Sequence, residues 1–314
     1  MQTPIRIGTR GSPLALVQTQ AVIAALAKAH QWTQAEADKN TAIIKIRTSG
    51  DRIQDRSLAD LGGKGLFAKE IEEAMLAGDI DCAVHSLKDM PTFLPPGLVL
   101  DCVLEREDPR DALISTAGAT LKSLRQNAVI GTSSVRRQAL LLNARPDLKM
   151  VLLRGNVETR LGRVTAGDID ATILALAGLK RLNRTAAVSS IFETSEMLPA
   201  VAQGTIGIEM RESDSRLRTM FGRINHLQTL LSVTLEREYL SVLDGSCKTP
   251  IAGLAIQSVE GEMSFSGSAL SPDGKQRFDV ARRAKVVTVA DAQAVGRSAG
   301  DELLARAGRA FFQV

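Results

Sequence analysis

The chain has 314 residues, 44% of them hydrophobic, so at roughly 150 residues per domain it can form two or three domains with buried cores. Its net charge is only +4, and its three cysteines and three histidines are scattered, which argues against a disulfide framework or a metal site and favours a reducing compartment, the cytoplasm. No apolar run reaches the ~18 residues of a membrane span and no signal segment opens the chain, so we expect no membrane partner.

Strands and helices are expected to alternate along the first 210 residues, with a long polar loop at Thr48–Gly63. The apolar runs predict strands at Ile5–Gly8, Ala42–Arg47, Asp81–His85, Gly97–Leu104, Ala112–Ser115, Ala128–Gly131, Lys149–Leu153 and Ala171–Leu174. Capping residues and periodicity predict helices at Leu14–Ala29, Leu66–Leu76, Ser134–Asn143, Val157–Thr165 and Leu176–Leu182. This alternation predicts an α/β fold with largely parallel sheets.

The last third of the chain has a different pattern. Leu217–Leu243 is helical by periodicity, and three short strands follow at Ile251–Ser258, Glu262–Leu270 and Gln276–Val280, with a turn at Ser271–Gly274. Asp291–Ala310 closes the chain as a helix. This order predicts a separate small α+β domain, a three-stranded sheet with helices.

Positive charge is concentrated in the middle of the chain. Arg106–Arg184 holds 14 Lys and Arg against 7 Asp and Glu, a net of +7, so the remainder sums to −3. Such a block favours an anionic partner. Aromatic residues are only 3% of the chain and the arginines are spaced singly, so a small polyanion fits better than a nucleic acid.

Three strand–helix junctions carry arginines and hydrogen-bonding side chains beside a helix N-terminus, where anions bind well. Plain helix capping is the better interpretation of any one junction, and a carboxylate-binding crevice at the strand ends is the better interpretation of all three together. The residues concerned are Arg10 and Ser12; Ser134, Arg136 and Arg137; and Arg154 and Arg160.

Two loops are candidates for chemistry. Gly62–Gly65 fails the phosphate-loop pattern because Gly65 stands where Ser or Thr is needed, so we interpret it as a hinge or lid carrying Lys64. Asp89 follows a strand beside Lys88, and the pattern favours a turn residue and a cation-stabilising carboxylate almost equally.

The cysteines divide into two kinds. Cys82 and Cys102 lie in apolar strands and are expected to be core residues. Cys247 lies in a small-residue loop beside Lys248, which favours an exposed, reactive thiol over a surface cysteine without a role.

Long ordered motifs along nearly the whole chain resemble the porphobilinogen deaminase family. They are RIGTRGSPLA (6–15), GGKGLF (62–67), AVHSLKD (83–89), EREDPRDA (105–112), GTSSVRRQ (131–138), LRGN (153–156), LALAGLKR (174–181) and Cys247.

The resemblance implies a transferase of tetrapyrrole and haem biosynthesis, a hydroxymethylbilane synthase. Such an enzyme joins four porphobilinogen molecules head to tail, releases ammonia at each step, and uses a dipyrromethane cofactor bound covalently by a thioether. The implied cofactor residues are Cys247 (the thioether), Ser134, Arg136, Arg137, Lys88 and Asp89, with Asp89 and Lys88 also catalytic. The implied substrate residues are Arg10, Ser12, Gln18, Lys64, Phe67, Arg154, Arg160 and Arg181.

The resemblance also implies three domains, the first two like periplasmic binding proteins. We expect domain 1 at residues 1–104 plus 200–222, domain 2 at 105–199, and domain 3 at 223–314 with the cofactor cysteine. We expect a monomer whose partners are porphobilinogen and the growing oligopyrrole chain. The sequence departs from the family at Ser246 and Ala202, where glycine is frequent, and Gln31–Asn40 is somewhat long.

Two other functions are compatible with parts of the pattern. A carboxylate-binding sensor would explain the α/β halves and the arginines, but it needs neither Cys247 nor a third domain. A nucleic-acid-binding protein is suggested by the sequence pI of about 9.1, and a steep salt dependence of DNA binding would support it.

Overall fold

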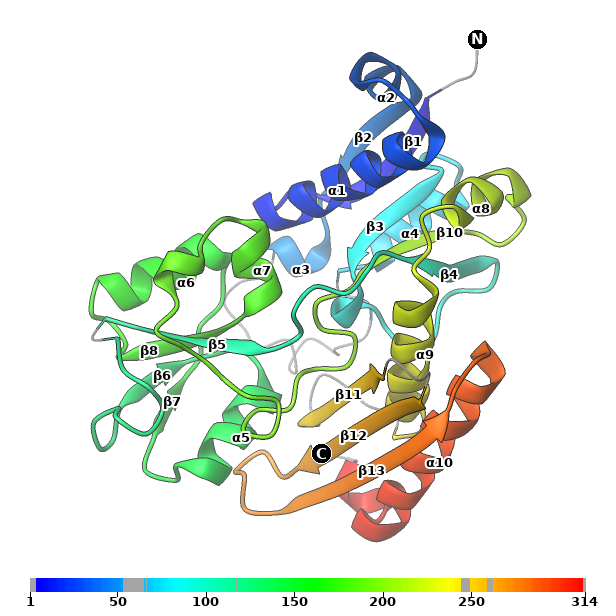
Figure 1. Cartoon of the computed structure of the whole chain (residues 1–314). Helices are drawn as coiled ribbons and strands as arrows, with labels where there is room; N and C mark the ends of the chain where they lie inside the picture. The colour runs from blue at the N-terminus through cyan, green and yellow to red at the C-terminus, as the bar shows by residue number, and fades with distance from the viewer. Residues whose placement is uncertain are drawn as a thin grey trace. The chain divides into compact units, whose positions relative to one another are not determined.

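The computed structural model describes residues 4–52, 65, 67–116, 118–243, 249–258 and 262–312. The proposed site residues Lys64 and Cys247 therefore lie outside the described residues, as does most of the expected loop Thr48–Gly63. The chain forms two compact units (Figure 1). The first comprises Met1–Ile53, Gly65–Glu107 and Thr205–Leu230, and the second comprises Gln54–Lys64, Asp108–Gly204 and Leu231–Val314.

The first unit is built on a five-stranded sheet of order β2-β1-β3-β10-β4. β1 is parallel to β2 and β3, whereas β10 is antiparallel to β3 and β4. Its strands are β1 (Ile5–Arg10), β2 (Thr41–Ile46), β3 (Cys82–Ser86), β4 (Leu98–Val103) and β10 (Ile206–Arg211). Its helices are α1 (Pro13–His30), α2 (Gln34–Asn40), α3 (Ser49–Arg52), α4 (Lys69–Leu76), α8 (Ser215–Gly222) and the turn η1 (Leu87–Asp89).

Helices cover both faces of this sheet. Successive side chains of a strand point to opposite faces, so each strand contributes to two cores. Val84 and Ile208 pack in one core with Leu26 of α1. Ala83, the neighbour of Val84, packs in another core with Ile71 of α4. The apolar runs in the strands are explained by this double coverage.

The second unit contains a sheet of the same pattern, of order β7-β6-β8-β5-β9. β6 is parallel to β7 and β8, and β5 is antiparallel to β8 and β9. Its strands are β5 (Asp111–Ser115), β6 (Val129–Gly131), β7 (Lys149–Val151), β8 (Ala171–Ala175) and β9 (Ser190–Ile191). Its helices are α5 (Val135–Ala144), α6 (Val157–Thr165), α7 (Leu176–Arg181) and the turn η2 (Thr185–Ala187).

A three-stranded antiparallel sheet, β11-β12-β13, completes the second unit. Tyr239 packs edge-on against Phe265 in its core, with ring centroids 4.9 Å apart. The turn between the last two strands lies against α5: Gly274 has a φ of 72°, and its carbonyl accepts a hydrogen bond from Asn143 at 2.8 Å. The elements are α9 (Leu227–Val242), β11 (Ile251–Gln257), β12 (Glu262–Leu270), β13 (Arg277–Lys285), α10 (Val289–Ala307) and η3 (Arg309–Phe312).

The predicted fold class is confirmed: two α/β sheets and a small three-stranded sheet with helices. In each five-stranded sheet four of the five strands run in the same direction, as expected for largely parallel sheets, and β10 and β5 are the antiparallel exceptions. The prediction of one helix over Leu217–Leu243 is wrong. The chain turns between α8 and α9, where His226 N–H donates to Val103 O and the His226 ring contacts Thr229 Oγ1 at 2.8 Å.

Two further differences concern local structure. The somewhat long segment Gln31–Asn40 contains α2, which Thr33 and Glu36 begin with a reciprocal capping box. The third strand of the small sheet runs to Lys285, beyond the predicted Val280. The prediction stopped where the apolar residues end, but polar residues can also form an exposed strand.

Candidate active site

The end of β1 and the start of α1 line a pocket in the first unit. Ser12 Oγ accepts a hydrogen bond from Ala15 N–H at 3.3 Å and so caps α1. Arg10, at the end of β1, donates from Nε to Asp51 Oδ1 at 3.2 Å, and its guanidinium lies 4.1 Å from the centre of the Phe67 ring. The capping interpretation of Ser12 is confirmed. The contacts with Asp51 and Phe67 hold the Arg10 side chain in one orientation.

Asp51 is held in its ionised form by its partners. Burial opposes the charge of Asp51, but the hydrogen bonds and charge of Arg10, together with Thr48, hold the pKa of Asp51 below its ordinary value. Nε and Nη2 of Arg10 make the contacts to Asp51, and Nη1 has no hydrogen bond to any described residue. Arg10 therefore retains a donor for a further carboxylate.

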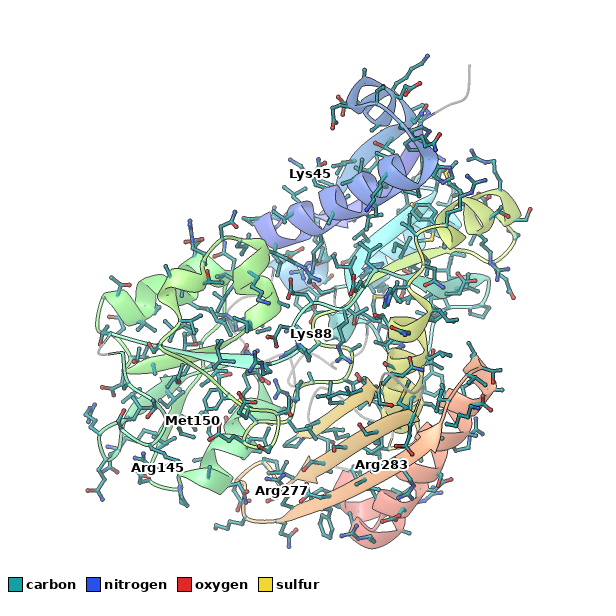
Figure 2. All side chains as sticks on the ribbon, in the orientation of Figure 1. Lys45, Lys88, Arg145, Met150, Arg277 and Arg283 are labelled. Atoms are coloured by element: carbon teal, nitrogen blue, oxygen red, sulfur yellow. The ribbon has the colours of Figure 1, made fainter. Side chains whose placement is uncertain are left out.

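The residues after β3 complete the pocket. β3 ends at Ser86, whose hydroxyl donates to the buried Gln18 at 3.0 Å. The turn η1 follows with two exposed residues, Asp89 and Lys88, of which Lys88 is labelled in Figure 2. The Asp89 carboxylate makes no hydrogen bond or ion pair to a described residue. The pocket is lined by Arg10, Ser12, Gln18, Phe67, His85 and Asp89, among others.

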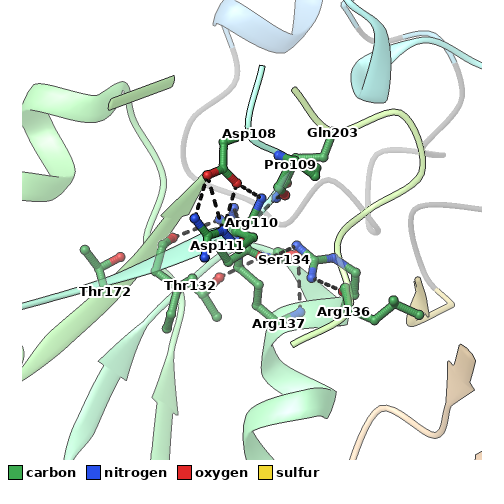
Figure 3. Close-up of polar contacts among 12 residues, drawn as sticks. Asp108, Pro109, Arg110, Asp111, Thr132, Ser134, Arg136, Arg137, Thr172 and Gln203 are labelled. Atoms are coloured by element: carbon green, nitrogen blue, oxygen red, sulfur yellow. Dashed lines mark hydrogen bonds and ion pairs between the residues drawn. The ribbon is translucent and has the colours of Figure 1, made fainter. Parts of the chain in front are cut away.

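In the second unit two arginines converge on one aspartate (Figure 3). Arg136 Nη2 and Arg137 Nη2 each lie 2.8 Å from a different oxygen of Asp111, and Gln203 Nε2 donates to the same carboxylate at 2.9 Å. The side chains of both arginines are 6% exposed, and that of Asp111 is fully buried. The three charges leave a net positive charge inside this unit.

The two arginines are also tied to the backbone. Arg136 Nη1 donates to Leu198 O at 2.7 Å, and Arg137 Nη1 donates to Ile173 O at 2.8 Å. Burial lowers the pKa of Arg136, while Asp111 opposes that change. Arg136 Nε is buried without a hydrogen-bond partner among the described residues, so this cluster has an unused donor.

The other predicted arginines of this unit lie at the ends of β7 and α7. Asn156 caps α6 by accepting from Thr159 N–H at 2.9 Å, and Arg160 donates to Gly155 O at 3.0 Å. Arg181 donates to Gly204 O at 2.7 Å. Arg154 is half-buried just after β7.

The structure therefore groups the proposed site residues in two places. Arg10, Ser12, Gln18, Phe67, Lys88 and Asp89 lie in or beside the pocket of the first unit, and Ser134, Arg136, Arg137, Arg154, Arg160 and Arg181 lie in the second. Sequence reasoning missed Asp51, Asp111, Gln203 and the buried His85–Glu209 pair, which lies 3.0 Å apart. The motif EREDPRDA contained Asp111, but no local pattern named its partners. No helix in the described part of the chain is long and apolar enough to cross a membrane.

Comparison with known proteins gives consistent matches. Residues 5–219 match the family model "Porphobilinogen deaminase, dipyromethane cofactor binding domain", and residues 230–305 match "Porphobilinogen deaminase, C-terminal domain". Porphobilinogen deaminase of Nitrobacter hamburgensis is 52% identical over 307 residues, which cover 98% of this chain and 94% of that protein. The chloroplastic enzyme of Oryza sativa subsp. japonica is 49% identical over 308 residues, 98% of this chain and 85% of that protein. A sulfonate-binding protein, SsuA of Methylobacillus flagellatus, aligns at 14% identity and a TM-score of 0.39, over 76% of this chain and 69% of that chain.

Two mixed α/β sheets, each with arginines and hydroxyl groups near its strand ends, define the class: an α/β protein whose polar side chains gather at the ends of its strands. The matches then give the family. The chain belongs to the porphobilinogen deaminase family, transferases of tetrapyrrole biosynthesis, and residues 5–219 form its dipyrromethane-cofactor-binding region.

Proposed function

We propose that the chain is a hydroxymethylbilane synthase that joins four porphobilinogen molecules head to tail on a covalent dipyrromethane primer. Each step releases ammonia, and hydroxymethylbilane is the product. The observation that carries the proposal is Asp89, an exposed carboxylate that lines a pocket beside Arg10 in a chain of this family.

Asp89 has two roles in this proposal. As an ionised carboxylate it accepts hydrogen bonds from the pyrrole N–H groups of the substrate. It also stabilises the positive charge that develops on the substrate when ammonia leaves, because a fixed negative charge close to a developing cation lowers the barrier. Its turn, η1, is held at the end of β3 by the backbone hydrogen bond from Leu87 N to Thr205 O, which fixes the direction of the loop.

The cations of the first unit bind the acetate and propionate groups of the substrate. Arg10 offers Nη1, and Lys88 and Ser12 add donors. Gln18 orients Ser86 in the pocket wall, and Phe67 restricts Arg10. Lys64 is proposed to bind the same substrate groups. These assignments depend on the match between positively charged side chains and the carboxylates of the substrate. The planar guanidinium group of an arginine can bind both oxygens of a carboxylate.

The second unit is proposed to bind the carboxylates of the cofactor and of the growing chain. The chemistry of its donors fits such a group, since Arg136 retains a buried Nε donor and the cluster around Asp111 has a surplus positive charge. Ser134, Arg136 and Arg137 would hold the cofactor; Arg154, Arg160 and Arg181 would hold later rings. When bound through Cys247, the cofactor supplies the pyrrole carbon to which the first substrate is joined.

The intact mass of the purified protein, with peptide mapping of the Cys247 region, tests this function first. We expect an added mass equal to two porphobilinogen units less two ammonias, on Cys247, and none in a Cys247→Ser variant. Cys82 and Cys102 are internal controls, because both are buried and burial raises the pKa of both thiols. An unmodified Cys247 after incubation with porphobilinogen would contradict the proposal and favour a carboxylate sensor.

The remaining assignments follow from the same proposal. We propose three domains, with residues 1–104 plus 200–222 as domain 1, 105–199 as domain 2 and 223–314 as domain 3. We also propose that the protein acts as a cytoplasmic monomer without nucleic acid. Gel filtration tests the monomeric state, and cell fractionation tests the cytoplasmic location.

A further inference from the structure

A buried acid–base cluster lies behind the wall of the Asp89 pocket. His85 of β3 lines the pocket, and its Nε2 lies 3.0 Å from Glu209 Oε2 on β10. The exposed fraction of the His85 side chain is 5%, and that of Glu209 is zero. In the antiparallel register His85 pairs with Gly207 and Glu209 pairs with Ala83, so both side chains lie on the sheet face that α4 covers.

A second carboxylate lies in the same layer. Glu72 of α4 is 7% exposed, and α4 packs against β1, β3 and β10. Burial, with the nearby charges of Glu209 and Glu73, raises the pKa of Glu72 to about 7. Glu72 Oε1 and Glu209 Oε1 are both buried without a hydrogen-bond partner among the described residues. Two buried carboxylates and one imidazole therefore lie in the layer between α4 and the sheet.

The other charged groups on these elements have their own partners. On β1, Arg6 pairs with Asp81, the residue before β3, and Arg10 pairs with Asp51; on β10, Arg211 contacts Asp81. On α4 itself, Lys69 and Glu73 are exposed and lie 3.9 Å apart, and Glu70 accepts a hydrogen bond from Ser49 N–H. The cluster itself contains two acidic side chains and one basic side chain, so its acidic groups are in surplus.

We infer that Glu72, Glu209 and His85 form an electrostatic support for the reaction at Asp89, in which the surplus negative charge of the cluster stabilises the cation that the substrate becomes when ammonia leaves. The inference rests on the proposed function. Glu72 and Glu209 are positioning residues in this scheme, because they act through the electric field in the pocket and not by touching the substrate.

The argument depends on the low polarity around the cluster. A carboxylate at the surface is screened by water and salt, whereas a buried one acts over a longer distance. A buried pair of carboxylates without full hydrogen bonding also reduces stability, so packing alone does not account for it. Because His85 lines the pocket, the electric field of the cluster acts on a substrate that is bound there.

The test compares Glu72→Gln with Glu73→Gln in the holoenzyme. Glu73 is the exposed neighbour of Glu72 on the same helix, so it is a matched control. For the wild type we expect kcat to rise as pH increases through about 7, the pKa of Glu72. For Glu73→Gln we expect the same rise at a slightly lower pH, because the charge of Glu73 is the smallest of the causes that raise this pKa. For Glu72→Gln we expect no rise in that range, a kcat roughly 3–10-fold lower at higher pH, and a KM within about two-fold of the wild type.

A second measurement reports the cluster without turnover. The chain has only three histidines, so the ring signals of His85 can be assigned in an NMR titration by their loss in His85→Gln. We expect an inflection near pH 7 in the wild type and in Glu73→Gln, and its absence in Glu72→Gln.

The outcomes separate the inference from the proposed function. If the pH profile of Glu72→Gln parallels that of the wild type, the inference is wrong even though the enzyme is active. If the wild type makes no product from porphobilinogen, the proposed function fails, and the electrostatic role fails with it. Glu209→Gln keeps an acceptor for His85 and should lower kcat by a similar factor; should it not fold, the Glu72→Gln comparison still decides.

Discussion

The two five-stranded sheets share one strand pattern and use their acidic residues in opposite ways. In the first, Asp89 follows the third strand and is exposed, and two further acids, Glu72 and Glu209, are buried in the layer behind the pocket. In the second, Asp111 begins the antiparallel strand and is buried between two arginines. The same strand pattern therefore provides an exposed carboxylate beside a pocket in one sheet and a buried cluster with a surplus positive charge in the other. The contrast shows that strand topology fixes where side chains gather, whereas the charge of each site depends on a few residues.

The largest expected effect tests the second sheet. Asp111→Ala removes the carboxylate that both guanidinium groups contact, and leaving buried charges uncompensated costs about 3–5 kcal/mol. We expect the free energy of unfolding in urea to fall by that amount. Asp168→Ala is the control, because its pair with Arg163 is exposed and its loss should have no measurable effect. Equal stability of the two variants would contradict the buried cluster.

Asp89→Asn tests the first sheet, and here we expect turnover to fall while stability stays unchanged. Asp89 is exposed and makes no hydrogen bond to a described residue, so the unfolding free energy should stay as it is in the wild type. Turnover should fall by about 10²–10³-fold, because the fixed negative charge is lost. Product formation from porphobilinogen measures this, with the exposed Asp79→Asn as control. Near-normal turnover would remove Asp89 from the mechanism.

The acids behind the pocket should make the first sheet sensitive to pH. The pKa of Glu72 is raised to about 7, so between its ordinary pKa of 4.5 and about 7 the folded state binds more protons than the unfolded state. Stability from this group is complete below pH 4.5 and is lost as pH rises through about 7.

Glu72→Gln should remove that loss. We expect the wild type to lose about 1–3 kcal/mol more than Glu72→Gln between about pH 5 and about pH 8, measured by urea unfolding at each pH. Parallel pH dependence of the two proteins would show that Glu72 does not carry the proton.

The smallest expected effect on the free energy of unfolding concerns Ala202, in the segment that precedes β10. Ala202 has a φ of 59°, in the left-handed region, and its N–H donates to the buried Glu236. Ala202→Gly should raise the unfolding free energy by a few tenths to about 1 kcal/mol, because glycine adopts this conformation without strain. Ala200→Gly, at an ordinary φ, should instead be neutral or slightly destabilising. The opposite ranking in thermal melts would contradict this account.

Local signals in the sequence predicted most of the helices and strands, and they named Arg10, Ser12 and Asp89 of the pocket lining. Caps such as Ser12, Ser134 and Asn156 are read from neighbours a few residues away, and the helices that they begin were predicted to within a residue or two. The break between α8 and α9 was missed because it depends on Val103, a partner distant in the sequence.

The electrostatic environment could not be read in the same way. His85 and Glu209 are 124 residues apart, and Arg137 and Asp111 are 26 apart. Neither pair has a spacing that periodicity can reveal. An arginine in a motif is equally able to face solvent or to neutralise a buried acid, and only the fold decides between the two.

The position of β10 determines the order in which the chain can fold. β3 and β4 are neighbours in sequence, but each pairs with β10, which is synthesised only after residues 104–205. All five strands of the second sheet, by contrast, lie within residues 111–191 and can pair as soon as they emerge from the ribosome. The segment Leu87–Asp89, which follows β3, is thus made early and is among the last to reach its native surroundings. A chain that stops before β10 would expose two unpaired strand edges, which is a direct route to aggregation.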